Sequence, residues 1–450
     1  MIKEQKINQT NHKNQLNQGS DKGDMSKKRK NKISECCDIL DNLRVPINDE
    51  IRQTMQGNIP YYGANGIQGY INKYIFDEDL ILLAEDGGNF EEYHTRPIAY
   101  KISGKSWVNN HAHILRAKQE FNQDYIFYSL VHKDITKYLN SGTRSKLNKS
   151  ELEKIEIVFP ETKAKEDKIA RFLSTCDAII EKTQSAIAKY KAIKQGMLQD
   201  LFTRGIDPNT NKLRPRYQDA PELYKESKLG CIPREWDCDS IDNLTDKVGS
   251  GVTPTGGSEV YKTQGILFLR SQNILFGKLS LNDVAFISKE IDEVMENSRV
   301  KPFDVLLNIT GASIGRSAFF PEELTNANVN QHVCIIRFKK SSKSLAVFAS
   351  EYLNTDFGQR QMYKAMAVGN REGLNYQQIK AFNFPDIKNQ KELEKIASII
   401  ENINHKLQTE QTYLQKMQMV KKGLMEDLLS GKKQVLVKNE IEENESKISE

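Results

Sequence analysis

The side chains best suited to chemistry are arginines, lysines and amides in four glycine-containing loops. The turns "YYGANGIQG" and "LRSQNILFG" carry an asparagine at matching places, and the loops "SGTRSKLN" and "VGNREGLN" share a glycine and an arginine. Guanidinium and carboxamide groups bind the base edges and phosphates of DNA, and a nearby glycine allows close backbone approach. A polar loop without a ligand is the alternative at each site, and recurrence favours contact. The candidate DNA-contacting residues are Asn65, Arg144, Lys146, Arg270, Gln272, Asn273, Asn370 and Arg371.

No set of residues predicts an active site. The tripeptide "GKS" at 104–106 resembles the end of a phosphate-binding loop, but Ala99 stands where that motif requires glycine. The string "IPYYG" lacks the acidic or amide residue with which an amino-methyltransferase holds its target amine. His111 and His332 lie at matching positions, yet neither has a set of carboxylates or cysteines around it in the sequence, which favours a hydrogen-bonding role over catalysis. We predict no catalytic residue and no metal site.

The composition fits a soluble DNA-binding protein without demanding one. The net charge is only +5, from 65 Lys and Arg against 60 Asp and Glu, so any charge that binds DNA must be local. The six cysteines have no metal-binding or disulfide-framework spacing. The polar N-terminus lacks the apolar segment of a signal peptide, and no stretch is long enough to span a membrane. We therefore expect a cytoplasmic protein.

The chain repeats itself, and the repeat determines how the candidate loops are positioned. The segment Leu147–Gly205 matches Leu374–Gly431, and Val108–Arg116 ("VNNHAHILR") matches Val329–Arg337 ("VNQHVCIIR"). Two further blocks upstream match in the same order. Four ordered matches make chance similarity remote, so each half of the chain is predicted to hold one copy of the same structural unit.

Each copy ends in a long segment with apolar residues at alternating spacings of three and four, which predicts a coiled-coil helix. A helix of about 40 residues is on the order of 60 Å long, enough to hold two domains one or more DNA turns of about 34 Å apart. Thr183 and Glu410 occupy the same position of the apolar seam in the two copies. Each either fixes the register of helix pairing or is a polar residue tolerated at a solvated edge. A flanking apolar row (Leu173, Ile180, Ile187; Ile400, Leu407, Leu414) widens the stripe. The predicted interface comprises Ile169, Phe172, Ile179, Ile193, Met197, Ile396, Ile399, Ile403, Met417 and Leu424.

The globular segments mix short β-like runs with glycine-rich turns and a few shorter helices, which predicts the α+β class. The expected architecture is two globular α+β domains separated by two long antiparallel coiled-coil helices, with an internal pseudo-two-fold repeat. The predicted segments are a disordered polar tail (1–32), a first domain (33–160), a central helix (161–204), a linker (205–232), a second domain (233–386), a C-terminal helix (387–431) and a disordered tail (432–450).

Several strings resemble those of one protein family. They are "IPYYGANGIxGYI", "LLAEDGGNF" and "SGKSWVNNHAHIL" in the first domain, the "GxIPxxW" opening of the second, and the helix ends "KQGMLQDLF" and "KKGLMEDLL". In combination they are similar to the specificity subunit of Type I restriction-modification systems. The resemblance covers about residues 33–431, and the N-terminal tail departs from it.

The resemblance implies a sequence-specific DNA-binding subunit without catalytic activity. Each target-recognition domain would read one half of a bipartite site in double-stranded DNA, and the helices would set the spacer. Partners would be two modification subunits, which methylate adenine with S-adenosylmethionine, and motor-nuclease restriction subunits that use ATP and Mg. The alternatives are a single-chain DNA methyltransferase or nuclease, and a coiled-coil scaffold that does not bind DNA.

Overall fold

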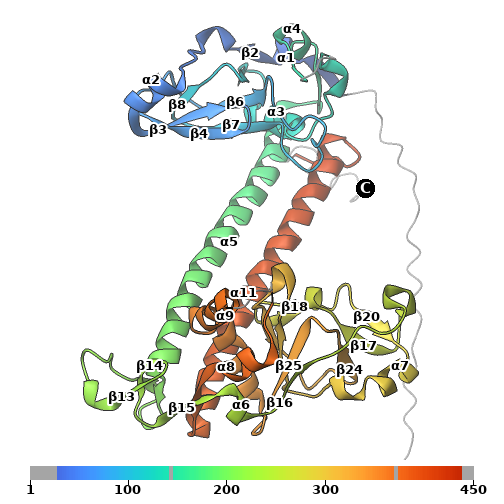
Figure 1. The fold of residues 1–450 in the computed structure, drawn as a ribbon. Coiled ribbons are helices and arrows are strands. Elements are labelled where there is room, and N and C mark those ends of the chain that lie inside the picture. Colours follow the sequence, from blue (N-terminus) through green and yellow to red (C-terminus); the bar gives the residue numbers. More distant parts are fainter. Residues whose placement is uncertain (1–27, 141–144, 369–372, 438–450) are drawn as a thin grey trace, which may run out of the picture. The chain divides into compact units, whose positions relative to one another are not determined.

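A computed structural model describes residues 28–140, 145–368 and 373–437 (Figure 1). The chain divides into two compact units, Met1–Lys182 with Leu414–Glu450, and Thr183–Tyr413. Each unit contains one β-rich domain, here called domain 1 and domain 2, together with part of each of two long helices. The predicted α+β class is confirmed.

Domain 1 contains two four-stranded sheets within the described ranges. One sheet has the order β2-β9-β6-β7 (Cys37–Ile39, Ala112–Ala117, Leu80–Ala84, Ala99–Ile102). The other has the order β4-β3-β8-β5 (Gly66–Ile71, Gln56–Gly63, Lys105–Val108, Phe76–Asp77). The strand pair β1–β10 (Arg29–Lys32, Glu156–Phe159) and the helices α1 (Ile33–Cys36), α2 (Asp49–Thr54), α3 (Gln123–Leu130) and α4 (Lys149–Leu152) complete the domain.

Domain 2 repeats this topology in its described residues. The sheet β16-β25-β22-β23 (Thr245–Ser250, Val333–Phe338, Val305–Asn308, Ser317–Phe319) corresponds to the first sheet. The sheet β20-β17-β24-β21 (Ala285–Ile287, Ile266–Leu269, Ala327–Val329, Arg299–Val300) corresponds to the second, including its parallel pair. The strands β15 (Trp236–Ser240), β26 (Asn383–Ile387), β18 (Ile274–Leu275) and β19 (Lys278–Leu279), and the helices α6 (Ile241–Leu244), α7 (Lys289–Val294), α8 (Lys343–Asn354), α9 (Asp356–Val368) and α10 (Tyr376–Lys380) surround them.

In each domain, one interior strand of the first sheet described is apolar because both of its faces are covered. These strands are β6 in domain 1 and β22 in domain 2. In β6, Ile81 and Leu83 belong to one core cluster, and Leu80 and Leu82 belong to another. Side chains alternate between the two faces of a strand, so a strand covered on both sides reads as a continuous apolar run such as "LILLA". The run "VLLN" of β22 fits the same pattern in domain 2.

The two long helices are α5 (Lys163–Arg204) and α11 (Gln390–Leu424), which ends in a π-helical turn at Met425–Leu429. Within the first unit, the start of α5 packs against the end of α11: Leu173 shares a core with Leu428. Within the second unit, Leu198 near the end of α5 packs with Ile396 near the start of α11. In each unit the helices therefore run antiparallel, as predicted.

Burial along the helices departs from the predicted seam. Ile169 and Ile396 are buried, but Phe172 and Ile193 are 41% and 45% exposed, so both are wrongly placed in the interface. Positions of the flanking row are more deeply buried instead: Leu173, Ile187, Ile400 and Leu407. The remaining predicted positions are half-buried: Ile179, Met197, Ile399, Ile403, Met417 and Leu424. The helices pack against domain cores as well as against each other, so these cores shift and widen the buried stripe.

Two short segments predicted to be disordered are ordered. The strand β1 pairs antiparallel with β10, from Arg29 opposite Phe159 to Lys32 opposite Glu156. After α11, Val435 is buried in the core of domain 1. Hydrogen bonding and apolar burial therefore extend the first unit beyond the predicted limits of 33 and 431. Residues 1–27 and 438–450 of the predicted tails lie outside the described residues.

Candidate nucleic-acid interface

In domain 1, the chain segments that leave β3, β6 and β8 meet at one edge. The backbone N–H of Asn109 donates to Tyr62 O (3.0 Å), and that of Glu85 donates to His111 O (2.9 Å). A fourth segment returns here, since Leu147 N donates to Glu85 O (2.8 Å). Residues 63–68, 85–89, 109–111 and 145–147 form what we call the polar edge of domain 1.

Domain 2 has the same backbone bonds at the matching edge. Asn330 N donates to Leu269 O (3.2 Å), Ile309 N donates to His332 O (3.0 Å), and Leu374 N donates to Ile309 O (2.9 Å). We call residues 270–273, 309–311, 330–332 and 373–374 the polar edge of domain 2. The loops singled out in the sequence are thus gathered at one place in each domain.

The polar edges correct the register of the repeat at one position. Asn65 is three residues beyond Tyr62, and Gln272 is three residues beyond the equivalent Leu269. Asn65 therefore lies level with Gln272, whereas the sequence match paired it with Asn273. Asn65 and Gln272 are both exposed, and Asn273 is only 1% exposed.

Asn273 shapes the turn rather than presenting its amide to solvent. Its Nδ2 donates to Ser280 O (2.9 Å) and Asp283 O (3.1 Å), and its Oδ1 accepts a hydrogen bond from Arg270 N (3.0 Å). A buried carboxamide needs such partners. We therefore remove Asn273 from the candidate DNA-contacting residues.

Arg270 and Gln272 converge on one exposed acidic residue. Gln272 Nε2 donates to Asp283 Oδ2 (2.5 Å), and Arg270 Nη2 donates to Asp283 O (2.7 Å). The Arg270 guanidinium also lies 5.6 Å from the centre of the Tyr261 ring. These contacts hold both polar groups in a defined position, which lowers the entropy lost when they bind a ligand.

Two further candidates, Asn65 and Lys146, lie at the polar edge of domain 1. Lys146 is at the edge of domain 1, where its Nζ lies 3.0 Å from Glu85 Oε1 and its side chain is 46% exposed. Asn65 is held by a hydrogen bond from its Nδ2 to Gly87 O (2.8 Å). The remaining candidates, Arg144, Asn370 and Arg371, lie outside the described residues.

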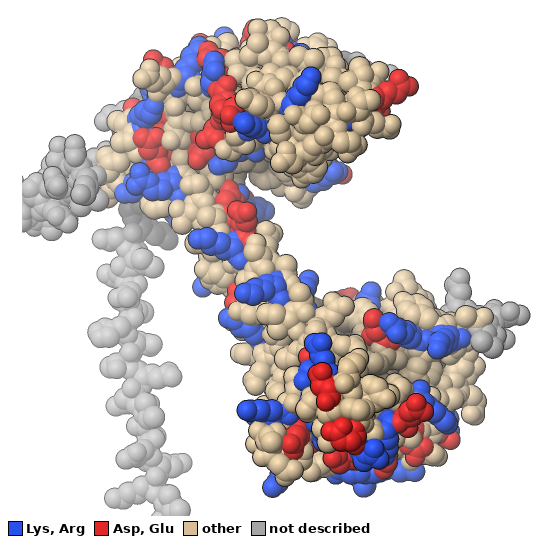
Figure 2. Space-filling view, turned by 90° about the vertical axis from the view of Figure 1, so that its left-hand side faces the viewer, with Lys and Arg blue, Asp and Glu red and all other residues tan. Residues whose placement is uncertain are grey.

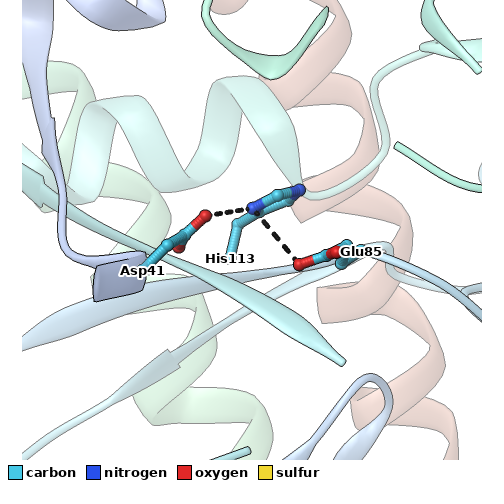
Figure 3. A group of neighbouring side chains, drawn as sticks. All are labelled: Asp41, Glu85 and His113. Atoms are coloured by element: carbon cyan, nitrogen blue, oxygen red, sulfur yellow. Dashed lines mark hydrogen bonds and ion pairs between the residues drawn. The ribbon is translucent and has the colours of Figure 1, made fainter. Parts of the chain in front are cut away.

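Glu85 of the polar edge of domain 1 belongs to a cluster that the sequence did not reveal: Asp41, Glu85 and His113 (Figure 3). His113 Nδ1 is 2.6 Å from Asp41 Oδ2, and its Nε2 is 2.7 Å from Leu147 O. The buried His113 ring therefore links Asp41 to the segment that carries Lys146 and holds that segment in place.

The cluster has metal-ligand residue types, but protein groups already occupy its acceptor atoms. Arg44 Nη1 lies 2.5 Å from Glu85 Oε2, and Ile114 N donates to Asp41 Oδ1 (3.0 Å). Burial raises the pKa of Asp41, but the hydrogen bond and charge of His113 outweigh it and hold that pKa below its ordinary value. Burial also raises the pKa of Glu85, but hydrogen bonds from Arg44 and Lys146 lower it, and the net effect is a pKa below the ordinary value. The arrangement is an ion-pair network.

The substitution Asp41→Asn tests this network. Asparagine preserves size and can still accept from Ile114 N, but it removes the negative charge opposite His113. We expect the free energy of unfolding to fall by about 2 kcal/mol at neutral pH, as for a hydrogen bond to a charged group. Because the pKa of Asp41 is lowered in the folded state, its contribution is present above the ordinary pKa of about 3.9 and is lost as pH falls through the lower value.

Urea unfolding at neutral and at acidic pH measures both effects. Asp38→Asn is the matched control, since Asp38 pairs with Arg116 at 3.4 Å on the surface and both side chains are about half exposed. The interpretation fails if the two variants lose the same stability, or if the cost of Asp41→Asn does not shrink in acid.

Sequence reasoning missed this cluster for a physical reason. Asp41, Glu85 and His113 come from a turn, a strand end and a strand that are far apart in the chain, so no spacing brings them together. The only signal was the segment "VNNHAHILR", in which His113 aligns with Cys334 of the second copy. Cys334 is fully buried in an apolar core, so the network belongs to one domain.

Comparison with known proteins shows which proteins this chain is similar to. Residues 25–189 match the family model of the Type I restriction modification DNA specificity domain. The Type I restriction enzyme MjaVIII specificity subunit of Methanocaldococcus jannaschii is 23% identical over 86% of this chain and 89% of its own length. S.HindORF215P of Haemophilus influenzae is 36% identical over 28% of this chain, and the match spans about a third (32%) of that relative's length.

The fold agrees with these matches. The crystal structure of a Type I restriction-modification system S subunit from M. genitalium has a TM-score of 0.62, with 15% identity, over 89% of this chain and 96% of that one. At this level of identity the likeness shows a shared fold, with β-rich domains and a pair of long helices. The chain is therefore similar to specificity subunits of Type I restriction-modification systems, and over most of its length to two of them.

Charge on the molecular surface is mixed. On the face drawn in Figure 2, basic and acidic side chains are interspersed over both domains rather than gathered into one broad patch. This agrees with the small net charge of +5. In the described part of the chain, no helix is long and apolar enough to cross a membrane.

Proposed function

We propose that each domain reads one half of a bipartite site in double-stranded DNA. The observation that carries this proposal is the repeated polar edge, where the same backbone bonds gather different side chains in the two domains. Two edges with the same backbone structure and different side chains suit two different half-sites, because side chains that contact base edges read the DNA sequence. The target-recognition domains would span about residues 29–160 and 233–386.

The residues proposed to contact DNA are the exposed members of the two edges and the adjacent loops. Asn65 and Gln272 occupy equivalent places, and Arg270 adds a guanidinium only in domain 2. Lys146 supplies a cation at the edge of domain 1. The predicted contacts of Arg144, Asn370 and Arg371 remain part of the proposal.

The long helices are proposed to set the spacer between the half-sites and to dock the modification subunits. The 42 residues of α5 make a helix on the order of 60 Å long at about 1.5 Å per residue. Adenine methylation would be performed by two modification subunits that bind S-adenosylmethionine. Cleavage would be performed by restriction subunits that use ATP and Mg. The complex is proposed to act in the cytoplasm.

Mapping methylated adenines in the source genome tests this function. We expect one bipartite motif to lose methylation when the gene for this chain is deleted and to regain it when the gene is restored. The purified chain alone should transfer no methyl group from S-adenosylmethionine to DNA until the modification subunits are added. Methylation of the motif in the deletion strain, or transfer by the chain alone, would contradict the proposal.

A further inference from the structure

The two edges share a histidine that the candidate contacts did not include. His111 and His332 occupy equivalent positions, and each is fixed by a buried asparagine two residues earlier. Asn109 Oδ1 accepts from His111 N (2.8 Å), and Asn330 Oδ1 accepts from His332 N (3.1 Å). Asn109 and Asn330 are only 4% and 8% exposed, whereas both histidines are partly exposed.

Each histidine also bonds inward through Nδ1. In domain 1, His111 Nδ1 lies 2.8 Å from Asp86 Oδ1. Because a carboxylate only accepts, Nδ1 carries the hydrogen. In domain 2, His332 Nδ1 lies 2.5 Å from Thr310 Oγ1, and the Nε2 of the Gln331 amide lies 3.1 Å from His332 Nε2. An amide nitrogen donates, so His332 Nε2 accepts and Nδ1 again carries the hydrogen.

The neutral form of both rings therefore presents Nε2 as a hydrogen-bond acceptor. His111 also lines a hollow of about 340 Å³ together with Asn65, Gln68 and Asp86, so there is room beside it for a ligand. Gln331 is exposed in domain 2, where Asn110 stands in domain 1, and a ligand can displace such a side chain. A neutral imidazole acceptor does not suit a phosphate, but it does suit an amino group.

We propose that His111 and His332 are matched specificity-determining residues, each accepting a hydrogen bond through Nε2 from the exocyclic amino group of adenine or cytosine. In the major groove these amino groups are the only hydrogen-bond donors on the bases. The proposal rests on the proposed function, because it requires each polar edge to face DNA. It assigns one base pair in each half-site to one histidine.

The test is the enrichment of duplexes from a randomised library by the full chain in complex with its modification subunits. His111→Phe retains a ring but removes the acceptor. We expect it to abolish the base preference at one position in one half-site and to weaken binding of the wild-type motif about threefold to tenfold, as for one neutral hydrogen bond. His332→Phe should do the same in the other half-site only.

His111→Gln should restore part of the preference, because its Oε1 can accept near the position of Nε2. His132→Phe is the matched control: His132 is an exposed histidine of domain 1 whose Nδ1 bonds to Tyr93 O (2.6 Å). The thermal midpoint of every variant is measured to show that the domains remain folded.

Three outcomes have distinct meanings. An unchanged preference in both phenylalanine variants overturns the inference, as does an equal loss of affinity for all sequences, which would indicate phosphate contact. If the wild-type complex enriches no bipartite sequence, the proposed function itself has failed.

Discussion

A chain in which residues 241–382 are replaced by the corresponding segment of a related protein is expected to direct methylation to a sequence changed in one half only. This segment is domain 2 without the strands that close it. Ile241 N donates to Phe382 O (2.9 Å), and β15 pairs with β26 directly beyond this bond. The two junctions are therefore neighbours, so a foreign domain can be inserted with little change to the helices.

The inserted domain must still match the apolar face of α5. Phe202 of α5 packs edge-on against Phe348 of α8, with ring centres 5.0 Å apart. The exchange should therefore keep Phe348 and its apolar neighbours on α8. Methylated adenines are mapped in cells that express the hybrid chain with the modification subunits.

The reciprocal exchange provides the control. In domain 1, Ile33 N donates to Ile155 O (2.9 Å), the equivalent of the bond that closes domain 2. Replacing residues 33–155 should change the half-site that the exchange of residues 241–382 leaves unchanged, and it should not affect the half-site read by domain 2. A change in both halves after either exchange would show that the domains do not read independently.

The second large effect is expected from Glu392→Gln, which should lower the free energy of unfolding of the second unit by about 3 kcal/mol. Arg214 and Glu392 form a buried two-point ion pair, with Nη1–Oε1 and Nη2–Oε2 distances of 2.5 and 3.0 Å, and the two side chains are 5% and 1% exposed. Glu392 Oε1 also accepts from Ile206 N (2.9 Å). Glutamine retains the size of the side chain but removes the buried charge opposite Arg214, whose guanidinium keeps the exposed Glu235 at 3.6 Å as an acidic partner.

Urea unfolding followed by the fluorescence of Trp236 measures this effect in the second unit. The chain has two tryptophans, so a Trp107→Phe background leaves Trp236 as the only reporter. Glu401→Gln, on the same helix, is the control. It breaks the pair with Lys343, whose side chain is 58% exposed against 42% for Glu401, and should cost less than about 1 kcal/mol. If Glu392→Gln and Glu401→Gln lowered the free energy of unfolding equally, burial of the Arg214–Glu392 pair would contribute nothing to stability.

Repetition made the fold predictable from sequence. Two copies of the same pattern must fold alike, and the backbone bonds of Leu147 and Leu374 are indeed equivalent. The phase of the helical stripe was not predictable to the residue. Phe172 lies at a seam position by spacing but is exposed, because the core of domain 1 is contacted by the adjacent Leu173.

The sequence predicted which loops form the candidate site, but not which of their side chains are exposed or what hydrogen bonds they make. A shift of one residue in the alignment paired Asn65 with Asn273 rather than with Gln272, and only the hydrogen bonds of the turn distinguish the buried amide from the exposed one. The His113 ring lies between two hydrogen-bonding partners contributed by distant segments, Asp41 and Leu147. Such convergence follows from tertiary packing, which sequence spacing does not record.

The burial of Leu428 and Val435 in the core of domain 1 has a consequence for biosynthesis. Domains emerge from the ribosome in order, the N-terminal one first. Here the core around Ile169 and Leu173 is closed by Leu428 and Val435, which follow domain 2 in the chain. Domain 1 can therefore be completed only after all of domain 2 has been translated.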